Sequence, residues 1–495
     1  MITSEVELMT RCKKFIDINS FGGLFVAGVI IVIMSIIFNL LNSDYYDTFS
    51  NVIIYVALFS LVLGVFLMHR NKKLNVKNIL WLIFICSLFV KIGYVIKYPY
   101  TVNQHDLESL DGYGHLGYIY RLAEFKGLPD TNEWQLYNPP LHYFICSIFF
   151  NIGRLLGCSI DASFENLQML TMFWSSGVTI ISLKILRLLN FKGLPLILTY
   201  SVIAFNPMFT ILGGNINNDV LAFFLVTVSL YYLIKYQYQL KKADLMLFSL
   251  FSGMSIMTKY SAFFAVFAML IYLAAFSIKI NRISVKGIAV TLAPIIIFGF
   301  WFPVKNALLF GQNIVHYNKL NQYSLLYIPY SFLSRIFNLT EHELSTPFCN
   351  PYNDNNIALY SLKNSLFGEY TFNSIIVGFM LICLNLFFVI FTVISIAFFM
   401  KKRGKYEQKH CYIPILFIFL GQIAFYIFYN FIEPYGCSMD LRIVPVLILC
   451  GIILFGFLLK YVHIRARTSK FYVVVYVILF LLISVFALLS SIIFI

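Results

Sequence analysis

The sequence predicts an all-α polytopic membrane protein with about 13 transmembrane helices. Of its 495 residues, 60% are hydrophobic and only 12% are charged, and the mean hydropathy is +0.82. A water-exposed domain would carry far more charge, and apolar runs of about 20 residues recur along the chain. The first run starts near Ser20 and many others follow it. We therefore expect a retained span there rather than a cleaved signal peptide.

The basic residues lie in short clusters between the apolar runs, although the net charge is +14. Such clusters set the orientation of a membrane protein, so nucleic acid is not an expected partner. The positive-inside rule places the N-terminus and the loop at 70–77 in the cytoplasm, and the loop at 99–140 on the other side. If the apolar run at 141–156 crossed the membrane, every later basic cluster would be inverted. We therefore expect a helix lying in, or dipping into, the outer interface.

Thirteen spans remain after this assignment, each close to the hydrocarbon thickness of a bilayer in length. They are expected at about 20–41, 51–69, 78–98, 165–187, 195–212, 218–236, 244–258, 260–278, 286–304, 372–400, 412–431, 440–460 and 471–494. Four regions follow from their order. These are a two-span extension at 1–77, a catalytic transmembrane core at 78–304 with its outer loop at 99–164, a second long outer loop at 305–371, and C-terminal helices at 372–495.

Acidic residues and histidines gather in the first outer loop, although the whole chain has only 22 Asp and Glu. The residues concerned are Asp106, Glu108, Asp111, Glu124, Asp130 and Glu133, together with His105, His115 and His142. Such side chains are costly to place beside a bilayer, and they are suited to proton transfer or charge stabilisation. We interpret this loop as the active-site entrance of a membrane enzyme.

Within this loop, 112–126 is predicted to form an amphipathic helix. Asp111, His115 and Tyr118 share one face of it. Asp111 could serve as the N-cap with His115 solvated, or both could belong to the site. Asp106 precedes the helix as a turn residue or as a catalytic carboxylate.

Three further outer residues allow two interpretations each. Asp219 in GGNINNDVLAFF is either a helix N-cap or a second carboxylate facing the same cavity as Asp106. Lys259 in GMSIMTKYSAFF either extends to the interface or meets an anion. Arg442 in CSMDLRIVPVL either pairs with Asp440 or binds a phosphate. Together, outer carboxylates could activate an acceptor while outer cations hold a phosphate leaving group, which suits a lipid-linked phosphosugar donor.

Several motifs resemble the GT-C superfamily of membrane glycosyltransferases, in the branch of protein O-mannosyltransferases and the lipid A aminoarabinose transferase. They are HD, GHLGYIYRL, GLP, WQLYNPPLHY, NNDVLAFF, MTKYSAFF, WFPVKNALLFG and MDLRIVP, in that order. The resemblance covers about 78–460 and implies a GT-C-like fold with interfacial helices in the first outer loop.

The resemblance also implies roles for particular residues. The first-loop catalytic Asp falls on Asp106, with Asp111 as the alternative because this chain has HDLESLD in place of an adjacent acidic pair. The second-loop Asp falls on Asp219, and the donor-phosphate cations fall on Lys259 and Arg442. The residues expected to bind substrate are His105, His115, Tyr137 and His142. No cofactor is certain, and a divalent metal is an alternative because metal dependence varies across the superfamily.

The expected activity is inverting glycosyl transfer from a polyprenyl-phosphate-linked donor to a glycan, lipid or protein on the extracytoplasmic side. The expected location is a bacterial plasma membrane with the site facing outside, or an ER membrane with a lumenal site in a eukaryote. A transporter or flippase of lipid-linked glycans is the alternative, but it would favour charges midway along the spans and inverted repeats. A polymerase or ligase of such glycans is a second alternative, and the NPPLH and NNDVLA patterns point away from it.

Overall fold

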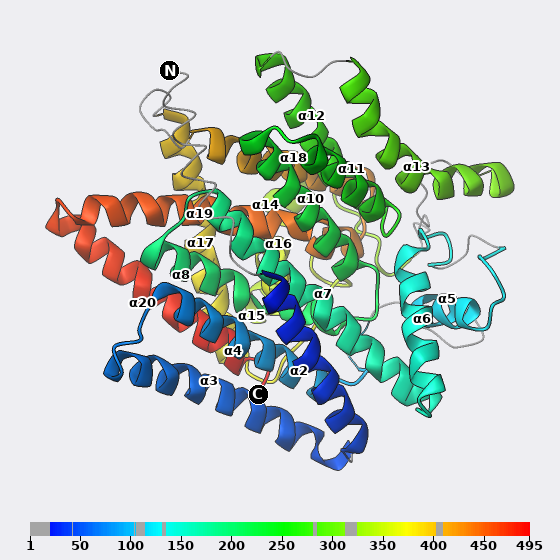
Figure 1. Ribbon diagram of the computed structural model, residues 1–495, viewed down its shortest axis with the longest axis horizontal. Coiled ribbons are helices and arrows are strands. Elements are labelled where there is room, and N and C mark those ends of the chain that lie inside the picture. The colour runs from blue at the N-terminus through cyan, green and yellow to red at the C-terminus, as the bar shows by residue number, and fades with distance from the viewer. Residues whose placement is uncertain are drawn as a thin grey trace. The chain divides into compact units, whose positions relative to one another are not determined.

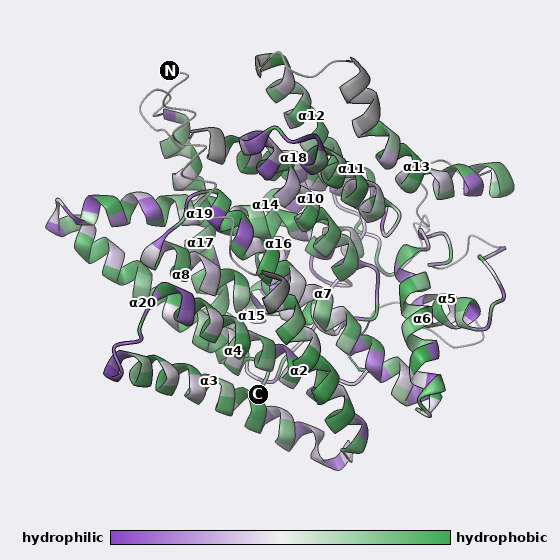
Figure 2. Ribbon diagram, viewed as in Figure 1, coloured by the Kyte–Doolittle hydropathy of each residue, from purple (hydrophilic) through white to green (hydrophobic). Residues whose placement is uncertain are grey.

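The computed structural model describes residues 20–41, 43–102, 104, 114–130, 135–280, 285–311, 324–401 and 409–495. Every regular element within these ranges is a helix, which confirms the predicted all-α class (Figure 1). Hydrophobic residues cover most of each helix, and hydrophilic ones gather at helix ends and in loops (Figure 2).

Ten helices of the described chain are long and apolar enough to cross a bilayer, so the chain is a polytopic membrane protein. They are α2 (Ser20–Leu40), α3 (Tyr46–Arg70), α4 (Val76–Lys97), α7 (Ile160–Leu188), α10 (Asp219–Gln239), α13 (Val285–Phe310), α17 (Ile375–Lys401), α18 (Lys409–Ile432), α19 (Pro445–Ala466) and α20 (Lys470–Ile492).

Three further expected spans also coincide with helices. The first is a pair of helices, α8 (Gly193–Ala204) and α9 (Pro207–Gly214), with a bend of 42° between them. If this pair is counted as one broken span, the number of candidate spans becomes eleven. The bend falls at Asn206-Pro207, where the proline lacks the N–H that would continue the helix. The other two are α11 (Lys242–Ile256), with 15 residues, and α12 (Ala262–Ile280), with 19 residues, and neither is among the ten helices above. Each expected span therefore has a helical counterpart, but the count of 13 is not confirmed.

Two short helices lie within the first outer loop, as predicted. These are α5 (Gly114–Ala123), shorter than the expected 112–126, and α6 (Leu141–Leu155). With 15 residues, α6 is about 22 Å long, which is less than the hydrocarbon core of about 30 Å. Its exposed side carries Phe144, Ile148 and Ile152. An apolar exposed side on a helix too short to cross is the pattern of an interfacial helix.

Smaller elements belong to the second half of the chain, apart from one turn that precedes α3. They are α14 (Phe332–Phe337), α15 (Glu341–Ser345), α16 (Ile357–Phe367), η1 (Ser43–Tyr45), η2 (Gly436–Met439) and η3 (Leu441–Ile443).

By their internal contacts, the residues form two compact units. The first combines Met1–Ser43, Val95–Ile181 and Leu212–Lys319, and the second combines Asp44–Tyr94, Ser182–Ile211 and Leu320–Ile495. Each unit therefore joins three stretches that are distant in sequence. The predicted region boundaries at 77, 304 and 371 follow the order of the spans and stay predictions.

In the first unit, α10, α11 and α13 pack closely together. Ser229 Oγ of α10 lies 3.1 Å from the carbonyl oxygen of Phe248 and 2.5 Å from Ser252 Oγ, both in α11. A Cβ at Gly253 would lie 2.5 Å from the carbonyl oxygen of Pro294 in α13, so only glycine permits this approach. This packing fixes the start of α10 and the end of α11, where two of the predicted site residues lie.

Candidate active site

Asp219 begins α10 at the end of a turn rich in asparagine. It is 3% exposed, and its backbone N–H donates to Asn217 Oδ1 at 3.1 Å. The N-cap is Asn218, so the interpretation of Asp219 as the cap is wrong. Asn218 Nδ2 instead donates to the carbonyl oxygen of Thr258 at 3.1 Å, which ties this turn to the end of α11. A carboxylate in the first turn of a helix is stabilised by the helix dipole.

Lys259, just after α11, forms an ion pair with Asp219 through Nζ and Oδ1. The two predicted residues thus lie in one site, and Lys259 meets an anion, as one interpretation expected. The Asp219 side chain is 2% exposed and that of Lys259 is 21% exposed. A ligand would therefore reach the pair from the lysine side.

A second ion pair joins the same two helices at their other ends. Lys235 Nζ of α10 lies 2.7 Å from Asp244 Oδ1 of α11, with side-chain exposures of 20% and 3%. Sixteen residues separate Asp219 from Lys235, which is about 24 Å along the helix axis. The two pairs are closely similar in burial and are well separated in space.

The start of the first outer loop is attached to the turn before Asp219. Gln104 Nε2 donates to the carbonyl oxygen of Gly214 at 2.8 Å, and its Oε1 accepts from the backbone N–H of Ile216 at 2.9 Å. Gln168 of α7 donates to the same Gly214 carbonyl at 2.8 Å. The predicted residues His105, Asp106 and Asp111 lie outside the described residues, and His105 and Asp106 directly follow this anchored glutamine in the sequence.

The NPPLH segment joins the same site through its backbone. The N–H of Leu141 donates to the carbonyl oxygen of Met257 at 3.1 Å. The carbonyl oxygen of Tyr137 accepts from Tyr260 Oη at 3.3 Å and from Asn306 Nδ2 at 3.5 Å. Tyr137 is therefore held by its main chain, and substrate binding by it stays a prediction. Segments of four quoted motifs, which are WQLYNPPLHY, NNDVLAFF, MTKYSAFF and WFPVKNALLFG, meet in this unit.

Of the three predicted histidines of this unit, the two that the structure describes are buried. His115 Nδ1 lies 2.9 Å from Tyr143 Oη, and Tyr143 stacks on Tyr118 with ring centroids 4.0 Å apart. The interpretation of His115 as a solvated residue is wrong, because α5 packs this face against α6. His142 has no exposed surface and lies against Trp174, and burial lowers its pKa to about 3, so its imidazole is neutral. Substrate binding by either histidine stays a prediction.

Arg442 belongs to the second unit. It forms an ion pair with Asp440, which was one of the two interpretations of this arginine. Its Nε lies 2.6 Å from Asp440 Oδ2, and its backbone N–H donates to Asp440 Oδ1 at 2.8 Å. Neighbouring contacts fix this loop. Asn364 of α16 accepts from the N–H of Leu441 at 2.7 Å, and Tyr426 Oη donates to the carbonyl oxygen of Met439 at 2.6 Å.

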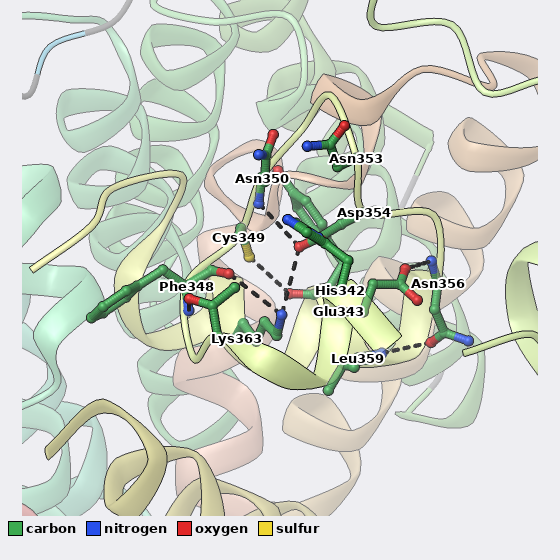
Figure 3. A network of polar contacts seen from close by, with 12 residues as sticks. His342, Glu343, Phe348, Cys349, Asn350, Asn353, Asp354, Asn356, Leu359 and Lys363 are labelled. Atoms are coloured by element: carbon green, nitrogen blue, oxygen red, sulfur yellow. Dashed lines mark hydrogen bonds and ion pairs between the residues drawn. The ribbon is translucent and has the colours of Figure 1, made fainter. Parts of the chain in front are cut away.

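A polar network in the second outer loop, shown in Figure 3, was not predicted from the sequence. Asp354 is 1% exposed and lies 3.6 Å from Lys363 Nζ and 3.4 Å from His342 Nδ1, and it accepts from the N–H of Asn350 at 3.0 Å. Buried charges of this kind stabilise one loop conformation when all members are paired.

Glu343 is the second centre of this network. Burial alone would raise its pKa, but hydrogen bonds from the backbone N–H groups of Asn356, Thr340 and Asn355 outweigh burial and hold the pKa below its usual value. Thr340 and Glu343 form a capping box, in which each side chain accepts from the other residue's N–H. The Thr-x-x-Glu spacing in the sequence was the signal that could have revealed it.

No three His, Cys, Asp or Glu side chains among the described residues lie close enough together to hold a metal ion. A divalent metal at this site would therefore need ligands such as Asp106 or Asp111, which lie outside those residues.

No protein-family profile matches the sequence, and no curated protein sequence matches it either. Among solved structures, the chain is similar to the crystal structure of ArnT from Cupriavidus metallidurans in the apo state. The identity is 12%, the similarity covers 79% of each chain, and the TM-score is 0.37.

Proposed function

We propose that the protein is a membrane glycosyltransferase. It transfers a sugar from a polyprenyl-phosphate-linked donor to an acceptor on the extracytoplasmic side, with inversion at the anomeric carbon. The acceptor oxygen or nitrogen attacks that carbon, its proton passes to a carboxylate base, and the bond from the carbon to the phosphate oxygen breaks. The polyprenyl phosphate leaves with the negative charge.

The ion pair of Lys259 and Asp219 is the observation that carries this proposal. Lys259 is a partly exposed cation at the end of an apolar helix, where a charge is costly unless it has a partner or a ligand. Asp219 holds its ammonium group in place from the buried side. A preorganised cation of this kind stabilises the charge that develops on a phosphate leaving group.

Other residues are assigned by their relation to this pair. Asp106 is proposed as the general base because it follows Gln104, which is anchored to the turn that leads into Asp219. Asp111 is the alternative base. Separately from this pair, Arg442 is proposed as a further phosphate ligand on the resemblance of MDLRIVP to the family motif, since a guanidinium group matches a phosphate in geometry. The acceptor is a glycan, a lipid or a protein.

Sugar transfer by the purified protein, from a panel of polyprenyl-phosphate sugars, tests the proposal. Asp106→Asn should abolish transfer and leave donor binding intact, because an amide cannot take the proton. Asp111→Asn serves as the matched variant in the same loop. Transfer that survives in Asp106→Asn and is lost in Asp111→Asn would move the base to Asp111.

A parallel measurement distinguishes the transport alternative. The protein is placed in liposomes and movement of a lipid-linked glycan across the bilayer is followed. Movement of the lipid without turnover of any donor would overturn the enzyme interpretation.

A further inference from the structure

The stretch 324–339 in the second outer loop is apolar on its exposed side. Outside the spans it exposes large hydrophobic side chains, namely Leu325, Tyr330, Leu333, Phe337 and Leu339. Its single charged residue is Arg335 of α14, and this residue is 1% exposed. The exposed surface of the stretch therefore carries no charge, unlike the polar turns that follow it at 340–356.

Arg335 joins this stretch to the end of a spanning helix. Its Nη1 donates to the carbonyl oxygen of Asn430 at 2.8 Å, and its Nη2 donates to Asn430 Oδ1 at 3.3 Å. Asn430 lies two residues before the end of α18 at Ile432. Phe332 of α14 also contacts Phe431 of α18, with ring centroids 5.5 Å apart. α14 therefore packs beside the last turn of α18.

A second attachment fixes the residues just before α14. The N–H of Ile328 donates to the carbonyl oxygen of Pro434, and the N–H of Gly436 donates to the carbonyl oxygen of Leu326, both at 2.8 Å. These partners follow directly on the end of α18, where a span leaves the hydrocarbon core. The stretch is thus held at the boundary of the membrane by contacts in α14 and by contacts just before it.

The last turn of α18 itself exposes apolar side chains. Ile427, Phe428, Phe431 and Ile432 are all exposed, as expected for the lipid-facing side of a candidate span. Phe431 of this surface is the residue that Phe332 of α14 contacts, so α14 adjoins it. An uncharged apolar surface next to a lipid-facing span is suited to acyl chains and is poorly suited to water.

We propose that α14 and its flanking residues dip into the lipid leaflet at the end of α18, with Leu333 and Phe337 among the acyl chains. Arg335 points inward and anchors the segment, and Tyr327 and Tyr330 lie at headgroup level, where tyrosine is favoured. The occupant of this apolar surface is the bilayer, not a second protein. This inference does not depend on the transfer activity.

Photocrosslinking in phospholipid nanodiscs tests the inference. The photoreactive residue p-benzoylphenylalanine replaces Phe337, which is 75% exposed, so the substitution removes little packing. The same probe at Phe428 of α18 is the lipid-facing reference. The probe at Tyr352, 62% exposed in the polar part of the same loop, is the matched control.

After illumination, lipid adducts are measured by mass spectrometry of the intact protein. The yield of lipid adducts at Phe337 should equal the yield at Phe428, and lipid adducts should be absent at Tyr352. Equal yields at Phe337 and Tyr352 would overturn the inference. Adducts at Phe337 that join two protein chains would also overturn it, because they would identify a protein interface.

Discussion

The two ion pairs that join α10 and α11 allow a matched substitution experiment. Lys259→Met removes the cation at the candidate site, and Lys235→Met removes its counterpart at the other end of the same helices. Each change leaves a carboxylate that is 2–3% exposed without a lysine that was about one-fifth exposed. The two variants therefore disturb the same helix pair in the same way, and only one of them changes the proposed site.

The losses of stability should be alike. Removing one partner of a fully buried pair costs about 3–5 kcal/mol, and a fully exposed pair contributes about 0–1 kcal/mol. The partly exposed lysines place both variants between these limits, at a loss of about 2–3 kcal/mol each. The activities should differ. Losing one group that stabilises developing charge lowers kcat by about 100- to 1,000-fold, so we expect this loss in Lys259→Met and an unchanged kcat in Lys235→Met.

The assay combines thermal unfolding of the detergent-solubilised protein with steady-state transfer from a saturating polyprenyl-phosphate sugar, compared at equal folded fractions. Asp219→Asn and Asp244→Asn complete the set from the carboxylate side. An equal fall of kcat in both lysine variants would show that the Asp219 pair acts by joining helices. An undiminished kcat in Lys259→Met would refute the leaving-group role.

Three further outcomes are expected. Gly253→Ala should reduce the free energy of unfolding by about 1–3 kcal/mol because its Cβ would meet the Pro294 carbonyl, whereas Gly451→Ala, whose Cβ would meet no atom closer than 3.4 Å, should not. A reduction of equal size in both would contradict the packing argument. Because the pKa of His142 is lowered to about 3, its contribution to stability is present above the unfolded pKa of about 6.5 and is lost as pH falls from there towards 3. His142→Leu should therefore flatten the acid limb of thermal stability, and an unaltered limb would count against this. Ionised Glu343 has a lowered pKa, so its contribution is present above the unfolded pKa of about 4.3 and is lost as pH falls through the lower folded value. Glu343→Gln should make proteolysis of the second outer loop insensitive to pH in that range, and a wild-type pH dependence in the variant would exclude Glu343 as its source.

The helices could be predicted from sequence because an apolar run of about 20 residues has few alternatives to a spanning helix. Boundaries were less accurate where local chemistry decides them. The span expected at 440–460 begins at Pro445, because a proline is favoured at the first helical position and Leu441–Ile443 form a separate turn. The helix expected at 112–126 is shorter, with its described part at Gly114–Ala123.

The pairing of Asp219 with Lys259 was not predicted, although the sequence carried its signal. α10 and α11 form an antiparallel hairpin with only Leu240 and Lys241 between them. Residues at similar distances from that turn face each other, which holds for Asp219 with Lys259 and for Lys235 with Asp244. The pairing of these residues depends on the exact length of the turn, which is two residues, and the sequence alone did not define that length.

The burial of His115 and His142 could not be inferred from their own helices. Asp111, His115 and Tyr118 repeat at the spacing of a polar face, which allowed a solvated histidine as one of two interpretations. The partner that buries His115 is Tyr143, which lies 28 residues further along the chain. Such a contact depends on how α5 meets α6, and periodicity within one helix contains no information about that.

The carbonyl oxygen of Gly214 accepts from both Gln104 and Gln168, which connects the first loop, α7 and the turn before Asp219 at one atom. A backbone oxygen cannot be altered by substitution, so selection can act only on its two donors. Over evolutionary time, loss of one amide would leave the Gly214 carbonyl with a single side-chain donor. This loss would favour a compensating change at the paired position. Related sequences that keep the Asn-rich turn should therefore vary at 104 and 168 in a correlated way, with an amide retained at both or replaced at both.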